Sequence, residues 1–166
     1  MSAKPLSSKP HLHLSNQLCL SLYSTSNAVI RAYRPLLQAM DLTYPQYLVM
    51  LALWQEDGLA VKHICERTRL ETGTVTPLLK RLEQKGLIVR AHSDLDERQK
   101  VISLTPAGQN LLKQADAVPG QLGCLTGMDA QTVLQLRAEI ETLYQKVLQA
   151  IELQKSLDAS AELEQE

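Results

Sequence analysis

The chain has 166 residues, which is enough for one ordinary domain with a hydrophobic core. Hydrophobic residues make up 45% of it and charged residues 21%, proportions typical of a soluble globular protein. The longest apolar run, residues 47–54, is much shorter than a transmembrane helix requires. The N-terminus also lacks the apolar core of a secretory signal, so we expect a cytoplasmic protein without membrane partners.

The net charge of −1 conceals an uneven distribution of charge along the chain. Residues 62–100 carry nine Lys and Arg against six Asp and Glu, a net of +3, and the remainder of the chain is acidic. Such a segment can face phosphate groups, although many DNA-binding domains are more basic than this. Charge alone therefore indicates nucleic acid binding only weakly.

The residues that carry most cofactor and metal chemistry are sparse. Three cysteines, at positions 19, 65 and 124, form no CxxC pair, which argues against a disulfide framework and a zinc cluster. The four histidines have no acidic or cysteine partner at metal-ligand spacing. The sequence also has no Gly-rich phosphate loop and no serine nucleophile elbow. We therefore expect no metal, no cofactor and no enzymatic activity.

The N-terminal part of the chain predicts two helices after an arm. Residues 1–14, with Pro, Ser and Lys, are expected to form a disordered arm. A helix is predicted from residue 15 to about residue 39 because apolar residues recur there at helical spacing. A second helix is predicted from Tyr44, with Thr43 as its cap, to the turn that precedes Gly58.

The middle of the chain changes from helical to alternating periodicity. The sequence predicts a short helix at 61–67 and a more clearly periodic helix at 72–84. Two β-type runs follow, at 87–91 and 100–104. Gly86 is expected to stop the second of these helices. The polar loop 92–99 joins the two β-type runs into a hairpin. A helix-turn-helix followed directly by a hairpin predicts a winged helix, whose second helix can enter the DNA major groove.

The C-terminal part predicts further helices. Thr105 and Pro106 begin a helix that runs to about residue 117, and a Pro- and Gly-containing break follows at 119–123. Asp129 then caps a long helix that reaches about residue 153. The predicted fold class is thus mainly α with a small β-hairpin wing. The outer helices are not needed for reading DNA, and we expect them to form a dimer interface that matches a palindromic operator.

These elements divide the chain into five predicted regions. The regions are the arm 1–14, the N-terminal dimerisation and sensing helices 15–58, the winged helix DNA-binding domain 59–105, the C-terminal dimerisation helices 106–154 and an acidic tail 155–166.

Short strings in these regions resemble a known family. Asp96-Glu97-Arg98 in the loop, followed by an apolar strand and Leu104-Thr105, resembles the wing of the MarR family. Within that family the chain is similar to the organic hydroperoxide regulators, the OhrR group, of the two-cysteine type. The strings that carry this similarity are Asn16–Cys19, Tyr33–Leu36, Leu42–Tyr47 and Thr74–Lys80, and the similar region covers about residues 15 to 120.

The resemblance implies roles for two of the cysteines. It places Cys19 at the peroxidatic position and implies that Tyr33 and Tyr44 of the partner subunit hydrogen-bond its thiolate. Cys124 corresponds to the resolving cysteine of the other subunit. Tyr47 shares a helix face with Tyr44 and can line the same pocket. Without the resemblance, Cys19 would be read as one more small apolar residue on a helix face.

Two further cysteine interpretations stay open at this point. Cys124 can also be a bystander thiol, in which case a small cellular thiol would cap oxidised Cys19. Cys65, on the short helix before the turn, is expected to fill the core.

The DNA-reading residues are predicted on the second helix of the pair and in the wing. They are Thr72, Thr74, Thr76 and Arg81 on the helix, with Arg98 at the wing tip and Asp96 orienting the wing. Short hydroxyl side chains at a helix start can contact bases and phosphates, and arginine suits a narrow minor groove. The threonines can alternatively serve as caps, with Thr72 capping in either case, and Arg81 can belong to a solvated helix face.

The resulting hypothesis is a redox-sensing transcriptional repressor. A reduced homodimer would bind double-stranded operator DNA and leave it when an organic hydroperoxide oxidises Cys19, with an intersubunit disulfide to Cys124. One alternative keeps the fold but makes the signal a reversibly bound aromatic or phenolic ligand. A second alternative, a catalytic thiol peroxidase, would leave the wing and recognition helix without a purpose.

Overall fold

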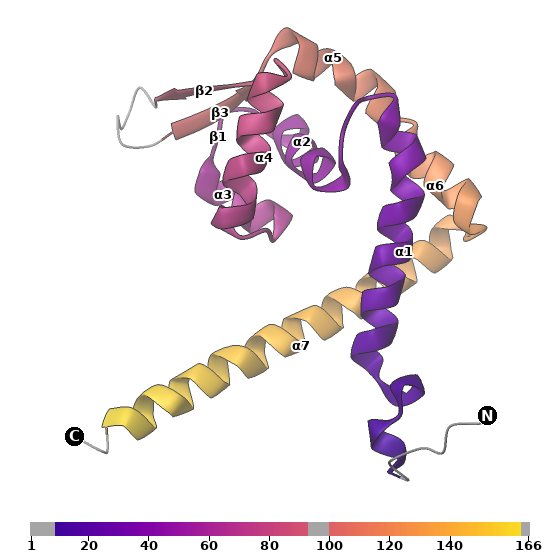
Figure 1. The fold of residues 1–166 in the computed structure, drawn as a ribbon, viewed down its shortest axis with the longest axis vertical. Coiled ribbons are helices and arrows are strands. Elements are labelled where there is room, and N and C mark those ends of the chain that lie inside the picture. The colour runs from indigo at the N-terminus through magenta and orange to yellow at the C-terminus, as the bar shows by residue number, and fades with distance from the viewer. Residues whose placement is uncertain (1–8, 93–99, 164–166) are drawn as a thin grey trace, which may run out of the picture. The chain divides into compact units, whose positions relative to one another are not determined.

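The computed structural model describes residues 9–92 and 100–163. It divides into two compact units, one up to Leu122 and one from Gly123 onward, and each is considered by itself. The helices are α1 (Leu18–Gln38), α2 (Tyr44–Gln55), α3 (Val61–Thr68), α4 (Thr72–Gln84), α5 (Pro106–Ala115), α6 (Val118–Thr126) and α7 (Ala130–Leu163), labelled in Figure 1. The strands are β1 (Leu59–Ala60), β2 (Ile88–His92) and β3 (Lys100–Leu104). No described helix is long and apolar enough to cross a membrane.

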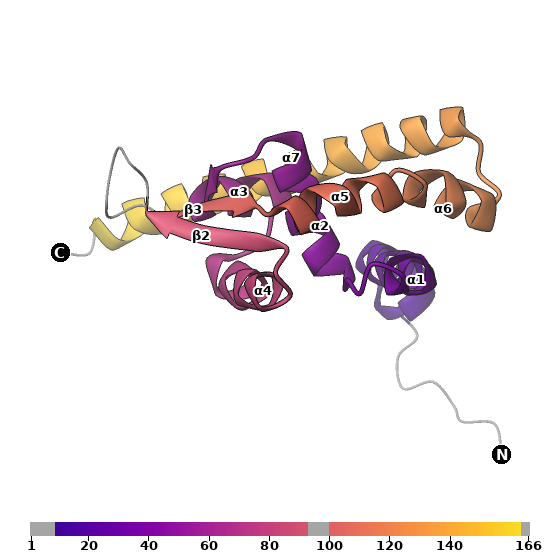
Figure 2. The same cartoon turned by 90° about the horizontal axis from the view of Figure 1, so that it is seen from above.

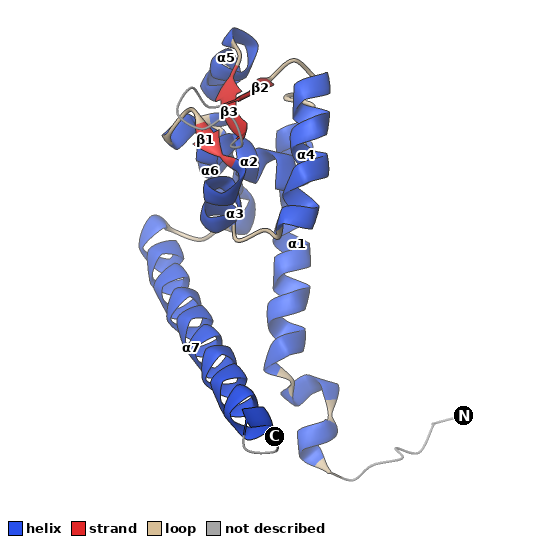
Figure 3. Ribbon diagram, turned by 90° about the vertical axis from the view of Figure 1, so that its left-hand side faces the viewer, coloured by secondary structure: helices blue, strands red, loops and turns tan. Residues whose placement is uncertain are grey.

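The first unit is built around α2, which is buried on most of its surface. α3, α4 and the strands pack close to this helix (Figure 3). Side chains with almost no exposure come from each of these elements: Val49, Met50, Leu53, Ile64, Val75, Leu79, Leu82, Ile88 and Ile102. Each fully buried aliphatic side chain of this kind contributes about 1.5–3 kcal/mol to folding. This core fixes the helix-turn-helix and the hairpin as one head.

The three strands form an antiparallel sheet in the order β1-β3-β2. The hairpin pairs Ile88 with Leu104 and His92 with Lys100, as the alternating pattern predicted, and it lies beside α4 (Figure 2). The short strand β1, which pairs Leu59 with Ile102, was not predicted. Two residues are too few to give a periodic signal. The head therefore has the element order of a winged helix, and the predicted fold class is confirmed.

Several helix ends follow local sequence signals. Thr43 and Gln46 form a reciprocal capping box at the start of α2, and Thr105 accepts a hydrogen bond from the Gly108 amide at the start of α5. Gly86 has a left-handed φ of +69° and ends α4, with the Leu87 amide donating to the Leu82 carbonyl. This is the bond pattern of a Schellman motif, which glycine permits without a Cβ penalty. These predicted boundaries are confirmed.

The N-terminal boundary differs from the prediction. α1 begins at Leu18 with Gln17 as its N-cap residue, and short 3-10 turns over Pro10–Leu12 and Leu14–Asn16 precede it. The Gln17 amide nitrogen donates to the His11 and His13 carbonyls at 2.6 and 3.1 Å, which closes these turns. Part of the segment expected to be disordered is therefore folded into turns.

Two C-terminal elements also differ from the predictions. The Pro- and Gly-containing segment predicted as a break is the helix α6. Pro119 occupies its second position, where the missing amide costs no helical hydrogen bond, and the buried Val118 anchors its start. α7 continues to Leu163, ten residues beyond the predicted end. Asp129 caps α7 as predicted, since its Oδ1 accepts from the Thr132 amide at 2.8 Å.

Candidate sensor site and DNA-reading surface

Cys19 lies in the first turn of α1 and is exposed. The apolar residues around it are exposed as well, with Leu18 at 62%, Leu22 at 39% and Tyr23 at 70%. This end of α1 points away from the head (Figures 1 and 3). The thiol therefore lies within an apolar helical surface and not in the core of the chain.

The structure brings together the three tyrosines that the sequence analysis singled out. The ring centres of Tyr33 and Tyr44 are 4.9 Å apart, and those of Tyr33 and Tyr47 are 6.0 Å apart. Tyr33 and Tyr44 are half-buried, whereas Tyr47 is only 3% exposed and also meets the Trp54 ring edge-on. Tyr33 and Tyr44 can therefore present groups to a neighbour, while Tyr47 mainly supports them from the core.

The phenols of this cluster are protonated at neutral pH, since the ordinary pKa of tyrosine is about 10 and burial raises it here. Burial raises the pKa of Tyr33 above its ordinary value, and the neighbouring Tyr44 and Tyr47 raise it further. Burial likewise raises the pKa of Tyr44. A phenol that retains its proton at neutral pH can donate a hydrogen bond to an anion. The cluster is thus suited to stabilise negative charge that is brought against it.

Cys19 does not reach this cluster within its own chain. It precedes Tyr33 by fourteen residues on the same helix, and a helix rises about 1.5 Å per residue, so about 21 Å separates them along the axis. Only a second copy of the chain can therefore bring a Cys19 thiol to these tyrosines. This geometry agrees with contact between subunits, which was implied by the family resemblance.

The other two cysteines have different settings. Cys124 is exposed and lies on α6, so the flexible break predicted around it is wrong. It belongs to the second compact unit and Cys19 to the first, and their pairing stays a prediction. Cys65 packs against the core as predicted, and its Sγ lies 3.7 Å from the Thr72 hydroxyl oxygen.

The predicted DNA-reading residues of α4 lie outside its buried face, but on two flanks of it: Thr72 and Thr76 on one, Thr74 and Arg81 on the other. All four are exposed, while the buried face of the helix packs in the core. Glu71 and not Thr72 is the N-cap residue, and no side-chain cap bond forms there, so the capping role expected for Thr72 is wrong. The Thr76 hydroxyl donates to the Thr72 carbonyl at 2.9 Å. Asp96 and Arg98 lie outside the described residues, and their roles stay predictions.

Two ion pairs that tie α4 to its surroundings were missed by the sequence reasoning. Arg90 on β2 binds the Glu83 carboxylate, and Lys85 binds Asp41 in the turn between α1 and α2. The second pair joins residues 44 positions apart, which no local pattern indicates.

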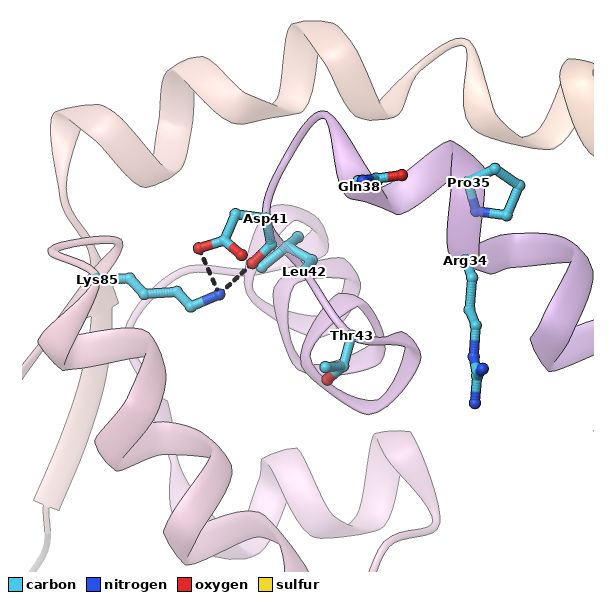
Figure 4. A pocket seen from close by; sticks show the side chains of 7 residues that line it. All are labelled: Arg34, Pro35, Gln38, Asp41, Leu42, Thr43 and Lys85. Atoms are coloured by element: carbon cyan, nitrogen blue, oxygen red, sulfur yellow. Dashed lines mark hydrogen bonds and ion pairs between the residues drawn. The ribbon is translucent and has the colours of Figure 1, made fainter.

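A pocket of about 430 Å³ adjoins the tyrosine cluster. It is lined by Ile30, Arg34, Leu42, Thr43, Tyr44 and Pro45. A second pocket, of about 450 Å³, shares three of these residues and extends to Lys85 (Figure 4). Among the described residues, no three His, Cys, Asp or Glu side chains come close enough together to hold a metal ion.

Comparisons with known proteins agree with this architecture. The family of transcriptional regulators described as SarA/Rot matches residues 31–115. The organic hydroperoxide resistance transcriptional regulator of Bacillus subtilis (strain 168) is 44% identical over 140 residues, which cover 82% of this chain and 95% of that protein.

Solved structures of one regulator, AbfR, are also similar. Reduced AbfR bound to DNA is 32% identical, with a TM-score of 0.69, and the match covers 87% of this chain and 99% of AbfR. Disulfide-formed AbfR is 35% identical, with a TM-score of 0.57, and the match covers 84% of this chain and 92% of AbfR. One of the similar crystal structures is that of AbfR of Staphylococcus epidermidis.

The head, in which α4 is the second helix of the helix-turn-helix and has an exposed face, defines together with these similarities a winged helix transcriptional regulator. The chain belongs to the MarR family of such regulators, among the organic hydroperoxide resistance regulators.

Proposed function

We propose that this chain is a homodimeric repressor that binds operator DNA when Cys19 is reduced and leaves it when an organic hydroperoxide oxidises that thiol. The observation that carries this proposal is the tyrosine cluster itself. Its Tyr33 and Tyr44 rings are 4.9 Å apart, and the exposed Cys19 of the same chain is too far along α1 to meet them. A dimer completes the site by supplying the thiol from the partner subunit.

Exposed apolar surface supports the dimer. A monomer seldom leaves a long apolar stripe open to water. On α7, Val133, Leu136, Ile140 and Val147, which are spaced by three, four and seven residues and so lie near one helix face, are each 40% or more exposed. The exposed apolar start of α1 is a second such surface, and a second copy of the chain can cover each of the two.

The DNA-binding half of the proposal rests on α4. Its first turn presents exposed threonines, and the free amides at a helix N-terminus favour phosphate. Two heads in a symmetric dimer would read half-sites about one helical turn apart. DNA-bound AbfR, which has a similar fold, supports this use of the head.

The proposed chemistry is a two-electron oxidation of the thiol. The Cys19 thiolate attacks the terminal peroxide oxygen, the O–O bond breaks, an S–O bond forms and the alkoxide leaves as an alcohol after taking up a proton. The phenols of Tyr33 and Tyr44 stabilise the thiolate by hydrogen bonds before this step. The resulting sulfenic acid is attacked by the Cys124 thiol of the other subunit, which forms an S–S bond and releases water. The solved disulfide form of AbfR supports such a second step.

Release from DNA follows from a change in geometry. In the proposed mechanism the helices that carry the two cysteines move until their Cα atoms lie within about 7 Å of each other, as a disulfide requires. The two heads then no longer match both half-sites. A 100-fold loss of affinity corresponds to about 2.7 kcal/mol.

Fluorescence anisotropy can test the proposal with a duplex that the reduced protein has selected from a random-sequence library. One equivalent of cumene hydroperoxide should release wild type, while Cys19→Ser should stay bound. Cys65→Ser is the matched control and should respond like wild type. On a non-reducing gel, Cys124→Ser should lose the covalent dimer that wild type forms. Equal release of Cys19→Ser and wild type would contradict the thiol mechanism.

A second candidate signal is an aromatic or phenolic ligand. The pocket of about 430 Å³ beside Tyr44, with the Arg34 guanidinium at its lining, could hold such a molecule. In that case Cys19→Ser would be released as readily as wild type by the ligand without any peroxide. The same anisotropy experiment therefore separates the two candidates.

A further inference from the structure

The turn between α1 and α2, residues 39–43, is called the α1–α2 joint below, and backbone hydrogen bonds define its conformation. Asp41 adopts a left-handed φ of +49°, which is uncommon for any residue other than glycine. The Leu42 amide donates back to the Leu37 carbonyl at 3.2 Å and closes the turn. On either side lie Tyr33 at the end of α1 and Tyr44 at the start of α2. A shift of the sensor helices must therefore pass through this joint.

Lys85 connects this joint to the recognition helix. It is the C-cap residue of α4, and its Nζ donates to the Asp41 carbonyl oxygen and lies 2.9 Å from the Asp41 carboxylate (Figure 4). The Lys85 side chain is 29% exposed and the Asp41 side chain 89% exposed. Water screens an ion pair so exposed, so the carboxylate adds little to the bond that Lys85 donates to the main-chain carbonyl.

The Lys85 end of this link also lies in a hydrogen-bonded turn. Gly86, with its left-handed φ of +69°, and the bond from the Leu87 amide to the Leu82 carbonyl, 3.0 Å long, lock the end of α4 directly after Lys85. The ammonium thus joins two fixed backbone turns, one in the sensor region and one in the DNA-reading head. Beside the link is the open pocket of about 450 Å³, which separates Lys85 from Arg34 and Pro35 of α1. On the side that faces the pocket, few side chains therefore pack against the α1–α2 joint.

We propose that Lys85 is a positioning residue that transmits movement of the α1–α2 joint to the recognition helix. This inference rests on the proposed function, because it concerns how the state of Cys19 reaches the DNA-reading surface. While the bond to the Asp41 carbonyl holds, a displacement of the joint also displaces the C-terminal end of α4. Without the bond, α4 is held mainly by the core around α2, and the head responds less to the sensor.

The test compares operator affinities of the reduced and oxidised proteins, with Lys85→Met as the main variant. Methionine keeps an apolar stem but removes the donor. We expect the ratio of oxidised to reduced Kd to fall at least about fivefold relative to wild type, a typical size for a coupling between sites. The rate of Cys19 oxidation by cumene hydroperoxide should stay within about twofold of wild type, because coupling in binding need not alter a rate.

Three further variants make the readout specific. Asp41→Asn tolerates the left-handed backbone and keeps the carbonyl, so it should retain the wild-type ratio. Lys80→Met removes an exposed lysine from the same helix and should also retain the ratio. Lys85→Arg keeps a donor next to a roomy pocket and should restore more of the ratio than methionine does. A role confined to stability would lower the melting temperature without changing the ratio.

Several results would overturn the inference. One is a Lys85→Met protein whose ratio of oxidised to reduced Kd equals that of wild type. Another is a Lys85→Met protein that loses the same DNA affinity in both redox states, which would mean that Lys85 merely contacts phosphate. If neither Lys85→Met nor Lys85→Gln melts cooperatively, Lys85 is a folding residue and the inference is wrong. A wild-type protein that stays on DNA after oxidation contradicts the proposed function and with it the transmitting role. If oxidation releases wild type from DNA and Lys85→Met has the wild-type ratio of oxidised to reduced Kd, only the Lys85 inference is contradicted.

Discussion

Arg90 on the first wing strand binds the carboxylate of Glu83 near the end of the recognition helix, with its Nε 2.8 Å from Glu83 Oε2. The guanidinium Nη2 contacts the same oxygen. This arrangement ties β2 to α4 outside the apolar core. The hydrogen bond from Arg90 lowers the pKa of Glu83 and, reciprocally, raises the pKa of Arg90.

The first prediction concerns the pH dependence of this pair. Because the folded-state pKa of Glu83 is lowered, the pair stabilises the head above the ordinary range of glutamate and loses this effect as pH falls through the lowered pKa. The difference in melting temperature between wild type and Glu83→Gln should therefore be constant from about pH 5 to pH 8 and shrink below about pH 4.

The matched control for that measurement is Glu66→Gln. Glu66 is 3.9 Å from Lys62 in an exposed pair on α3, and removing it should leave the melting temperature nearly unchanged at every pH. A Glu83→Gln difference that peaks at acid pH would contradict the assigned sign.

The second prediction concerns the close approach of α5 to the hairpin. A Cβ on Gly108 would lie 2.1 Å from the Leu87 carbonyl oxygen, and the Gly108 carbonyl accepts a hydrogen bond from the Trp54 indole at 2.9 Å. Gly108→Ala should therefore lower the free energy of unfolding by about 3 kcal/mol, measured by denaturant titration. Gly120→Ala, on α6 with no atom within 4 Å of the added Cβ, should instead raise it by up to about 1 kcal/mol. Equal effects at the two sites would contradict the contact with Leu87.

Local signals predicted most of the helix and strand ends. Thr43 as a cap, the Thr105-Pro106 pair and Gly86 each determine a helix end through a few neighbouring atoms, which is why these ends could be predicted from the sequence. The Gln46 half of the capping box at Thr43 was not predicted. α6 was missed because its Pro and Gly residues disfavour a helix locally, and burial of Val118 depends on the rest of the fold. Tertiary packing outweighed local propensity there.

In the candidate site, too, the local relationships could be predicted from the sequence and the tertiary contacts could not. Tyr44 and Tyr47 are three residues apart on one helix, so their shared face was predictable. Their contact with Tyr33 depends on how α1 packs against α2, and the family resemblance was needed to connect them. The bond between Lys85 and Asp41 bridges two turns that are distant in the chain, and only the folded arrangement reveals it.

The third prediction concerns the phenol of Tyr33. If it donates a hydrogen bond to the partner's reactive thiolate, Tyr33→Phe should slow the oxidation of Cys19 about tenfold, since hydrogen bonds to charged groups contribute about 1.5–3 kcal/mol. The rate can be followed by loss of free thiol in a Cys65→Ser, Cys124→Ser background. Tyr23→Phe, on the exposed part of α1, is the control and should keep the wild-type rate. An unchanged rate in Tyr33→Phe would remove the phenol from the mechanism.

The fourth prediction separates a phosphate contact at Arg81 from a merely solvated position. Arg81 is exposed on α4, whose buried side chains are Val75, Leu78, Leu79 and Leu82. Each phosphate neutralised by a basic side chain releases condensed counterions, so its loss lowers the dependence of log K on log salt by about one. Arg81→Ala should show this smaller slope and a weaker affinity in the reduced protein at about 0.1 M salt. Lys155→Ala, on the exposed end of α7, should leave both quantities unchanged. If Arg81→Ala also keeps the wild-type slope, the arginine belongs to the solvated face, and the predicted DNA contacts of α4 are limited to the start of the helix.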